Sequence, residues 1–180
     1  MKSQLEYTHF ANGIFMDYWG MPHVQSNLDP FKWGIDMVGR KAVVPGTGSD
    51  VFSTTYSVDV ARFLVRSLDL EKWSKSNIVC GSDITFNDVI ALAEKITGAK
   101  FHVVHDSLEK LEKNDVTLVS DEPVPGVPEE ISKAMMAQVG SLIIKGTYYL
   151  PTEGLLNDVF PDIHPTSLEE MLRKAWEGNE

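Results

Sequence analysis

A run of aromatic side chains around a glycine turn is the strongest candidate for a binding site in this chain of 180 residues. The run reads FANGIFMDYWG and follows a strand-like stretch at 5–10. Asn12-Gly13 permits a positive φ, so the backbone can turn sharply where that strand ends. The flat side chains around the turn are Phe10, Phe15, Tyr18 and Trp19. Packing alone would explain them, and a ligand site is the alternative, because open α/β sheets bind ligands at the carboxyl ends of strands.

The other reactive side chains form no pattern that predicts catalysis or metal binding. His102 and His105 stand three residues apart on a strand-like run, so their rings point to opposite faces. Cys80 lies in an apolar stretch without a basic neighbour to lower its pKa, and we interpret it as a small core residue. Asp59 and Arg62 are interpreted as a helix cap and a surface charge. We therefore predict no metal site and name no catalytic residue.

Two glycine-containing loops fall short of a phosphate-binding loop. A strand-like run follows GTGSD at 46–50, so the sequence predicts a hairpin turn there instead of a helix N-terminus. The loop CGSDIT at 80–85 does precede a helix, but it holds one glycine, and Asp83 and Asp88 add negative charge. We expect it to be a capped helix start.

Strand-like and helix-like patterns alternate along the chain and must position these residues. Strands are predicted at 5–10, on both sides of the 46–50 loop, at 77–82 and at 100–105. Helices are predicted at 13–19, from 57 or 59 onward, and at 85–98, 107–113, 128–144 and 166–178. This mixture indicates an α/β or α+β fold, and we predict a single domain, 1–180, without an internal linker.

Caps and apolar faces can be assigned for three of these helices. Thr85 and Asp88 cap one helix and Gly98 ends it, while Thr166 and Glu169 have the spacing of a capping box for the last helix. The helix that starts near 57 has an apolar face that we expect to be buried, formed by Val60, Ala61, Leu64, Val65 and Leu68.

Composition excludes several classes of partner. The chain has 26 acids against 16 bases, a formal charge of −10, which repels the phosphates of nucleic acids and anionic lipids. No apolar run approaches the roughly 20 residues needed to span a bilayer. The start of the chain lacks the apolar stretch of a secretory signal, and its one cysteine cannot form an internal disulfide. We therefore expect a cytoplasmic protein.

Three segments resemble, in this order, the later part of the NmrA-like and isoflavone-reductase-like proteins, which are atypical short-chain dehydrogenases. They are LEYTHFANGIFMDYWG, then KAVVPGTG with FSTTYSVDVARFLVRSLDLEKW, then NIVCGSDITFNDVIALAEKITGAKFHVVHDSLEKL. The likeness runs from about Leu5 to Trp176. It implies an α/β fold (α+β when isolated) that corresponds to the C-terminal, substrate-side portion of a Rossmann-type NAD(P)-binding protein.

The resemblance also implies site residues and a cofactor, NAD(P). By resemblance, the residues beside the nicotinamide are Phe10, Asn12, Gly13 and Phe15, and those near the substrate are Tyr18, Trp19 and Trp33. The family's glycine-rich fingerprint and its catalytic lysine precede the matched part. This sequence contains no G-x-G-x-x-G and no Tyr-x-x-x-Lys, so we do not expect this chain alone to bind NAD(P) or to transfer a hydride.

The predicted strand at 5–10 raises the question of what covers its edge. An interior strand of a parallel sheet that lacks a neighbour leaves backbone groups unpaired and apolar faces exposed. We expect a homo-oligomer or a partner chain to cover that edge, and the alternative is upstream coding sequence left out of the gene model.

The residues and the resemblance together favour one function and leave two others open. We expect the substrate-side portion of an NmrA-like NAD(P)-dependent oxidoreductase that acts on a small hydrophobic organic molecule and is not redox-competent alone. One alternative is a non-catalytic regulatory or binding protein of the NmrA type. The other is a cofactor-free isomerase or cyclase that uses the apolar cleft, with tyrosine or histidine as the proton donor.

Overall fold

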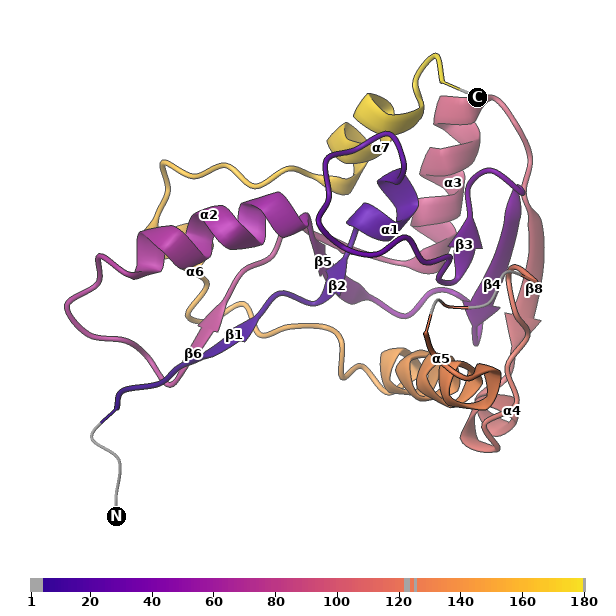
Figure 1. Ribbon diagram of the computed structural model, residues 1–180, viewed down its shortest axis with the longest axis horizontal. Helices are drawn as coiled ribbons and strands as arrows, with labels where there is room; N and C mark the ends of the chain where they lie inside the picture. Colours follow the sequence, from indigo (N-terminus) through magenta and orange to yellow (C-terminus); the bar gives the residue numbers. More distant parts are fainter. Residues whose placement is uncertain (1–4, 122–123, 125, 180) are drawn as a thin grey trace.

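The computed structural model describes residues 5–121, 124 and 126–179. The strands are β1 (His9–Ala11), β2 (Ile14–Phe15), β3 (Ile35–Asp36), β4 (Lys41–Pro45), β5 (Phe52–Thr55), β6 (Ser76–Ile78), β7 (Ser82–Ile84) and β8 (His102–Asp106). The helices are α1 (Asp17–Gly20), α2 (Ser57–Ser67), α3 (Phe86–Thr97), α4 (Leu108–Glu112), α5 (Glu129–Ile144), α6 (Leu156–Val159) and α7 (Leu168–Trp176). Figure 1 shows α2 at one end of the molecule and α4 and α5 at the other, with β2 and β5 between them.

Within the described residues the strands form three small sheets, with mostly parallel pairing between distant segments. β1 pairs with β6, β2 with β5, and β4 with β8, all parallel, while β3–β4 and β5–β7 are antiparallel. Parallel neighbours need long crossover connections, and helices such as α2 and α3 supply them here. The predicted α/β class is confirmed.

The predicted hairpin around GTGSD is wrong. β4 pairs with β3 and β8, whereas β5 lies in another sheet between β2 and β7. Gly46 and Gly48 adopt φ of 59° and 77° in the connecting loop, which carries the chain from one sheet to the next. Most residues of both strands are buried, which is typical of strands covered on both faces. Two short β-rich runs joined by a glycine loop therefore mark two interior strands here.

Aromatic rings form the centre of the main hydrophobic core. Trp19 and Phe86 are almost completely buried, and Trp19 stacks on Trp33 with 6.0 Å between ring centroids. The last helix closes this core, because Trp176 Nε1 donates a 2.7 Å hydrogen bond to the carbonyl oxygen of Trp19. The apolar face of α7 is buried in this core and consists of Leu168, Met171, Leu172 and Trp176.

The predicted buried face of α2 is wrong. Leu64, Val65 and Leu68 are 44%, 64% and 59% exposed, whereas Phe63 is completely buried. Phe63 packs with Val79, Leu156 and Phe160 in a second hydrophobic cluster, against which Phe10 packs. Asp59 and Ser67 are buried on the same side of the helix. Their polar groups are satisfied there, since Asp59 accepts the backbone N–H of Thr166 at 2.7 Å and Ser67 Oγ donates to Leu64 O. The hydrophobic pattern alone therefore predicted the wrong side of α2 to be buried.

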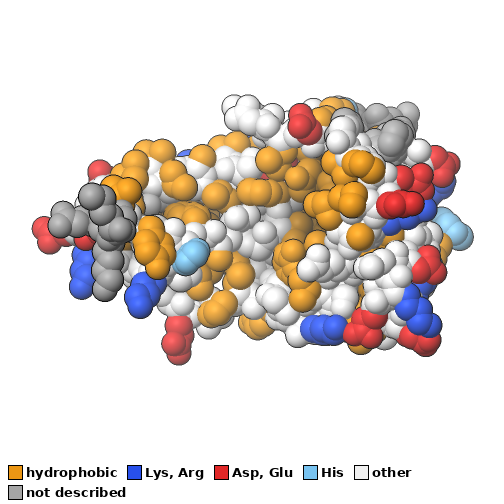
Figure 2. All heavy atoms as spheres, turned by 60° about the horizontal axis from the view of Figure 1, so that its bottom comes forward, with side chains coloured by type: hydrophobic (Ala, Val, Ile, Leu, Met, Phe, Trp, Pro, Cys, Tyr) orange, Lys and Arg blue, Asp and Glu red, His pale blue; other side chains and the backbone are white. Residues whose placement is uncertain are grey.

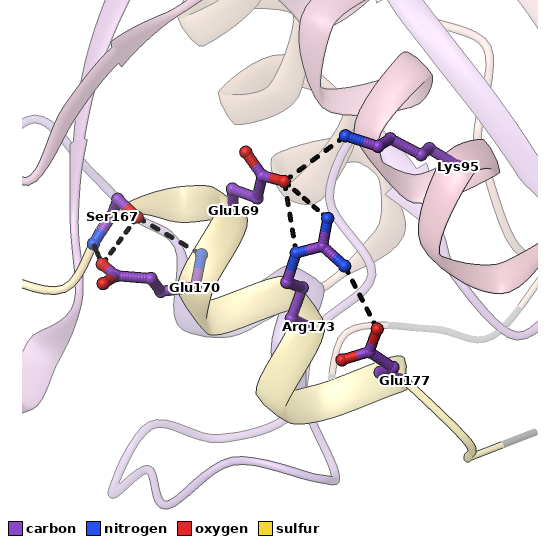
Figure 3. A network of polar contacts seen from close by, with 6 residues as sticks. All are labelled: Lys95, Ser167, Glu169, Glu170, Arg173 and Glu177. Atoms are coloured by element: carbon purple, nitrogen blue, oxygen red, sulfur yellow. Dashed lines mark hydrogen bonds and ion pairs between the residues drawn. The ribbon is translucent and has the colours of Figure 1, made fainter.

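Helix caps explain where α3 and α7 begin. The predicted cap of α3 is confirmed: Thr85 and Asp88 form a capping box, and Gly98 ends the helix with φ of 68°. The capping box of α7 lies one residue later than predicted and uses Ser167 and Glu170 (Figure 3).

Other predicted elements are confirmed with shifted bounds. The strand expected at 5–10 is shorter and ends one residue later, as β1, and that expected at 77–82 separates into β6 and β7. The predicted strand at 100–105 is β8, and the predicted helices at 107–113 and 128–144 are α4 and α5. In the part of the chain that the structure describes, no helix has both the length and the apolar character to cross a bilayer.

Candidate ligand site

A cavity of about 550 Å³ lies between the glycine turn and helix α5. Its volume is within the roughly 300–1,000 Å³ of small-molecule sites. Aromatic side chains from four parts of the chain line it: β2, α1, the loop before β3 and the segment after α5. They are Phe15, Tyr18, Phe31, Trp33 and Tyr148. Figure 2 shows the face of the molecule that is lowest in Figure 1, with hydrophobic side chains across its middle and most charged side chains toward its ends.

Gly13 lines this cavity and fixes the turn that builds its wall. Its φ is 67°, and a Cβ at this position would lie 2.0 Å from the backbone oxygen of Ser53. Glycine is therefore required both for the conformation and for the close approach to β5. The turn is also tied to β5 by Thr55, whose Oγ1 donates to the carbonyl oxygen of Asn12 at 2.8 Å.

Four of the seven residues assigned by resemblance line the cavity, namely Gly13, Phe15, Tyr18 and Trp33. The other three lie elsewhere. Phe10 packs against the second hydrophobic cluster, and Asn12 bonds within the turn. Trp19 is completely buried in the core, where its Nε1 donates to Trp33 O at 3.1 Å. Trp19 thus supports the wall from behind through Trp33 and does not itself line the cavity, and its place near a substrate stays a prediction.

Few polar side chains line the cavity, and their placement limits what it can bind. They are Tyr18, Asp29, Ser132 and Tyr148. Burial, followed by the negative charges of Asp17 and Asp29, raises the pKa of Tyr18 above its ordinary value. The Tyr18 phenol therefore stays protonated and can donate a hydrogen bond. No lysine or arginine of the described residues lines this cavity.

Sequence reasoning missed the wall formed by α5. The residues of this helix that line the cavity are Ser132, Met135, Met136 and Val139, and Asp29 from the loop between α1 and β3 lines it as well. The sequence did show Met135 and Val139 on one apolar side of a helix. Such a side is typical of core packing, and its use as a cavity wall depends on the distant turn at Gly13.

Cys80 and Asp59, the other reactive side chains considered from the sequence, lie outside the cavity. Cys80 is half-buried after β6, and burial, then the adjacent Asp83 carboxylate, raise the pKa of its thiol to about 12. In the described ranges, no group of three or more histidine, cysteine or acidic residues could hold a metal ion. Asp59 bonds Arg62 at 2.8 Å besides Thr166, so it serves as a buried tie between α2 and the start of α7.

These residues fit the apolar ring of a ligand better than a dinucleotide's phosphates. Aromatic walls suit a flat ring. Diphosphate binding needs free backbone N–H groups at a helix N-terminus, whereas at α3 the Asp88 carboxylate accepts the N–H of Thr85, and Thr85 Oγ1 accepts that of Asp88. Asp29 is the charged side chain among the described lining residues, and it repels phosphate.

Two fungal proteins are similar in sequence to this chain. "Oxidoreductase swnN" of Metarhizium robertsii is 30% identical, and the match covers 97% of this chain and 53% of that protein. "Oxidoreductase BOA1" of Botryotinia fuckeliana is 33% identical, with 92% and 52% covered. The chain thus spans about half the length of the curated relatives it matches. No family model matches the chain.

Solved structures share the fold. An isoflavone reductase superposes with a TM-score of 0.65 at 22% identity, covering 93% of this chain and 52% of that one. A structure from a study of pinoresinol-lariciresinol and phenylcoumaran benzylic ether reductases superposes with a TM-score of 0.68 at 15% identity. The match covers 94% of this chain and 52% of that one. AtPrR2 with NADP+ and (+)pinoresinol superposes with a TM-score of 0.63 at 16% identity, and the match covers 92% of this chain and 50% of that one. The resemblance to isoflavone-reductase-like proteins is confirmed at the level of the fold.

Proposed function

We propose that this chain, with its isoflavone-reductase-like fold, is the substrate-side portion of an NAD(P)-dependent oxidoreductase that acts on a small hydrophobic organic molecule. The observation that carries the proposal is the aromatic cavity at the Gly13 turn, about 550 Å³ in volume. Two relatives at 30% and 33% identity are named oxidoreductases. A neighbour in fold was solved with NADP+ and pinoresinol, an aromatic molecule in keeping with the walls found here.

In this proposal the chain's own residues bind and orient the ring-bearing substrate. Phe15 and Trp33 provide flat contact, and Tyr18 donates a hydrogen bond. NAD(P) would supply the hydride chemistry, with Gly13 and Phe15 beside the nicotinamide. The grip on its phosphates would come from outside residues 1–180, so we expect no redox turnover by this chain alone. The lone cysteine suits a reducing compartment, and we place the protein in the cytoplasm.

Binding of the neutral fluorescent dye phenylnaphthylamine would test the cavity. Val139 lines it, so Val139→Trp should fill it and weaken dye binding about tenfold. Ile131→Trp is the matched control, because Ile131 is an exposed residue of the same helix that does not line this cavity. Equal affinities for both variants and the parent would contradict the ligand site. Tight binding of NADPH by this chain alone would contradict the part of the proposal that places the phosphate grip elsewhere.

We also propose that a second copy or a partner chain covers β1 and α2. β1 has β6 as its strand partner in the described residues. The apolar face of α2 is exposed, with Val65 at 64% and Leu68 at 59%, and Tyr7 before β1 is 72% exposed. An apolar helix face beside a parallel strand usually packs against protein. Sedimentation at micromolar concentration tests self-association, and a monomer that binds no second chain would contradict the proposal.

A cofactor-free isomerase or cyclase is the second candidate, and the Tyr18 phenol favours it. Tyr18 lines the apolar cavity, and a tyrosine hydroxyl placed beside a bound molecule can act as a proton donor. Turnover of a hydrophobic compound without NAD(P), abolished by Tyr18→Phe, would support this candidate. A purely regulatory binding protein would show ligand binding without turnover under either condition.

A further inference from the structure

A buried serine lies where two cavities meet. Ser132, in the first turns of α5, is 8% exposed and lines both the main cavity and a smaller side cavity of about 120 Å³. Among the described residues the two cavities share five, of which four are apolar: Pro30, Phe31, Val124 and Met136. Ser132 is therefore the polar side chain at the junction.

The hydroxyl of Ser132 has no hydrogen-bond partner among the described residues, although its backbone N–H bonds Pro128 O at 3.0 Å. In the same part of the chain, every side-chain oxygen or nitrogen that is sealed from solvent does have a partner. The Oγ of Ser132 is therefore not sealed, and the open space beside this buried residue is that of the cavities. A hydroxyl in such a place is available to a bound molecule.

We propose that Ser132 Oγ anchors the ligand by a hydrogen bond to an oxygen of the ligand, a carbonyl or a hydroxyl. The inference rests on the proposed function and names the class of ligand more closely: an apolar, ring-bearing molecule with an oxygen partway along its length. The rings occupy the aromatic main cavity. The part beyond the oxygen enters the side cavity, whose described lining also includes Lys32 and Glu129.

The anchoring oxygen would determine orientation more than total affinity. Apolar contact with walls such as Phe31 favours many positions of a flat molecule, whereas one hydrogen bond at the junction selects among them. A hydrogen bond of this kind changes affinity by roughly 3- to 10-fold. A ligand without the oxygen would leave the hydroxyl unpaired and would bind without a preferred direction.

The fluorescent naphthyl ketone prodan and its analogue with a methylene in place of the ketone test this inference directly. Prodan emission shifts to longer wavelength when its carbonyl accepts a hydrogen bond. Ser132→Ala should weaken prodan binding about 3- to 10-fold, shift the bound emission to shorter wavelength, and leave binding of the methylene analogue unchanged. Ser132→Thr keeps the hydroxyl and should retain the longer-wavelength emission.

Ser141→Ala is the matched control. Ser141 lies on the same helix, is also 8% exposed, and lines neither cavity, so its variant should bind both dyes like the parent protein. Identical prodan affinity and emission in Ser132→Ala and the parent would overturn the inference while leaving the cavity as a ligand site. Failure of the parent to bind either dye would overturn both the inference and the proposed function.

Discussion

The carboxylate of Asp17 caps a helix that begins forty residues later at Ser57. Asp17 Oδ2 accepts the backbone N–H of Ser57 at 2.9 Å, and Oδ1 accepts its hydroxyl. Ser26 Oγ donates to the same Oδ1 at 2.8 Å. Asp17 is completely buried, so these bonds replace the water that the carboxylate loses on folding. One side chain thus links the glycine-turn segment to α2 and to the loop before β3.

Replacing Asp17 by alanine should lower the free energy of unfolding by about 2 to 4 kcal/mol, since three donors lose their acceptor in a buried place. Urea denaturation followed by circular dichroism measures the change. Asp69→Ala is the control, because Asp69 is an exposed partner of Arg66 and its loss should cost no more than about 0.5 kcal/mol. Equal effects of the two variants would show that the cap contributes nothing specific.

Alanine variants at Gly13 and Gly98 distinguish the cost of a left-handed backbone conformation from the cost of steric overlap. Their φ angles are 67° and 68°, but a Cβ at Gly13 would meet Ser53 O at 2.0 Å, whereas nothing lies within 4 Å of a Cβ at Gly98. We expect Gly98→Ala to cost about 1 kcal/mol for the left-handed conformation alone. Gly13→Ala should cost more than about 3 kcal/mol, because the backbone of β5 must move. Denaturation of both variants measures the difference, and similar costs would contradict the close approach.

At the start of α7, the loss of Ser167 should destabilise the protein more than the loss of its neighbour Thr166. Ser167 Oγ accepts the N–H of Glu170, and the Glu170 carboxylate accepts the N–H of Ser167 at 2.8 Å (Figure 3). Ser167→Ala should therefore destabilise the protein by about 1 kcal/mol. Thr166→Ala should have a smaller effect, because Thr166 binds Asp59 through its backbone N–H, which alanine retains. The reverse order in urea denaturation would restore the sequence-based assignment of Thr166 as the cap.

This pair of residues shows where sequence reasoning reached its limit. Thr166 and Ser167 are both good caps, each with a glutamate three positions on, so local chemistry does not choose between them. The choice is made by residues far away in sequence, since Ser82 Oγ accepts the N–H of Leu168 and Asp59 accepts that of Thr166. At α3 the cap was predictable because Thr85 has no rival at the neighbouring positions.

The candidate site was likewise predictable only where its residues stand close together in sequence. The Gly13 turn and the aromatic residues beside it stand together in sequence, so Phe15 and Tyr18 could be assigned to one wall. Ser132 and Tyr148 reach that wall through tertiary packing of α5, for which the sequence carries no local signal. Trp19 was assigned to the substrate side by resemblance, and only tertiary packing decides that it is buried in the core, stacked on Trp33.

The stabilising contribution of the Asp106 carboxylate should be lost in acid. Burial by itself raises the pKa of this carboxyl, but Lys110 at 2.7 Å and two hydrogen bonds from Thr117 outweigh burial and lower the pKa below its ordinary value. A lowered pKa stabilises the fold above the unfolded value near 3.8, and this contribution is lost as the pH falls toward the folded value. Asp106→Asn should thus cost more at pH 7 than at about pH 3.

Urea denaturation of the parent protein and Asp106→Asn across this pH range measures the effect. Asp162→Asn is the control, since Asp162 is exposed and no side-chain partner is described for it. The same pH dependence in the two variants would show that the charge of Asp106 does not stabilise the fold.

Cys80 should react slowly with alkylating reagents despite being half-exposed. Its pKa of about 12 leaves little thiolate at pH 8, so iodoacetamide should modify it about a thousandfold more slowly than a free thiol. The Asp83 carboxylate contributes to this pKa and accepts the S–H at 3.3 Å, so Asp83→Asn should raise the rate. Unfolding in urea should restore the ordinary rate in both proteins. Mass spectrometry of the time course measures the rates, and rapid modification of the folded parent protein would contradict the inert, structural position of Cys80.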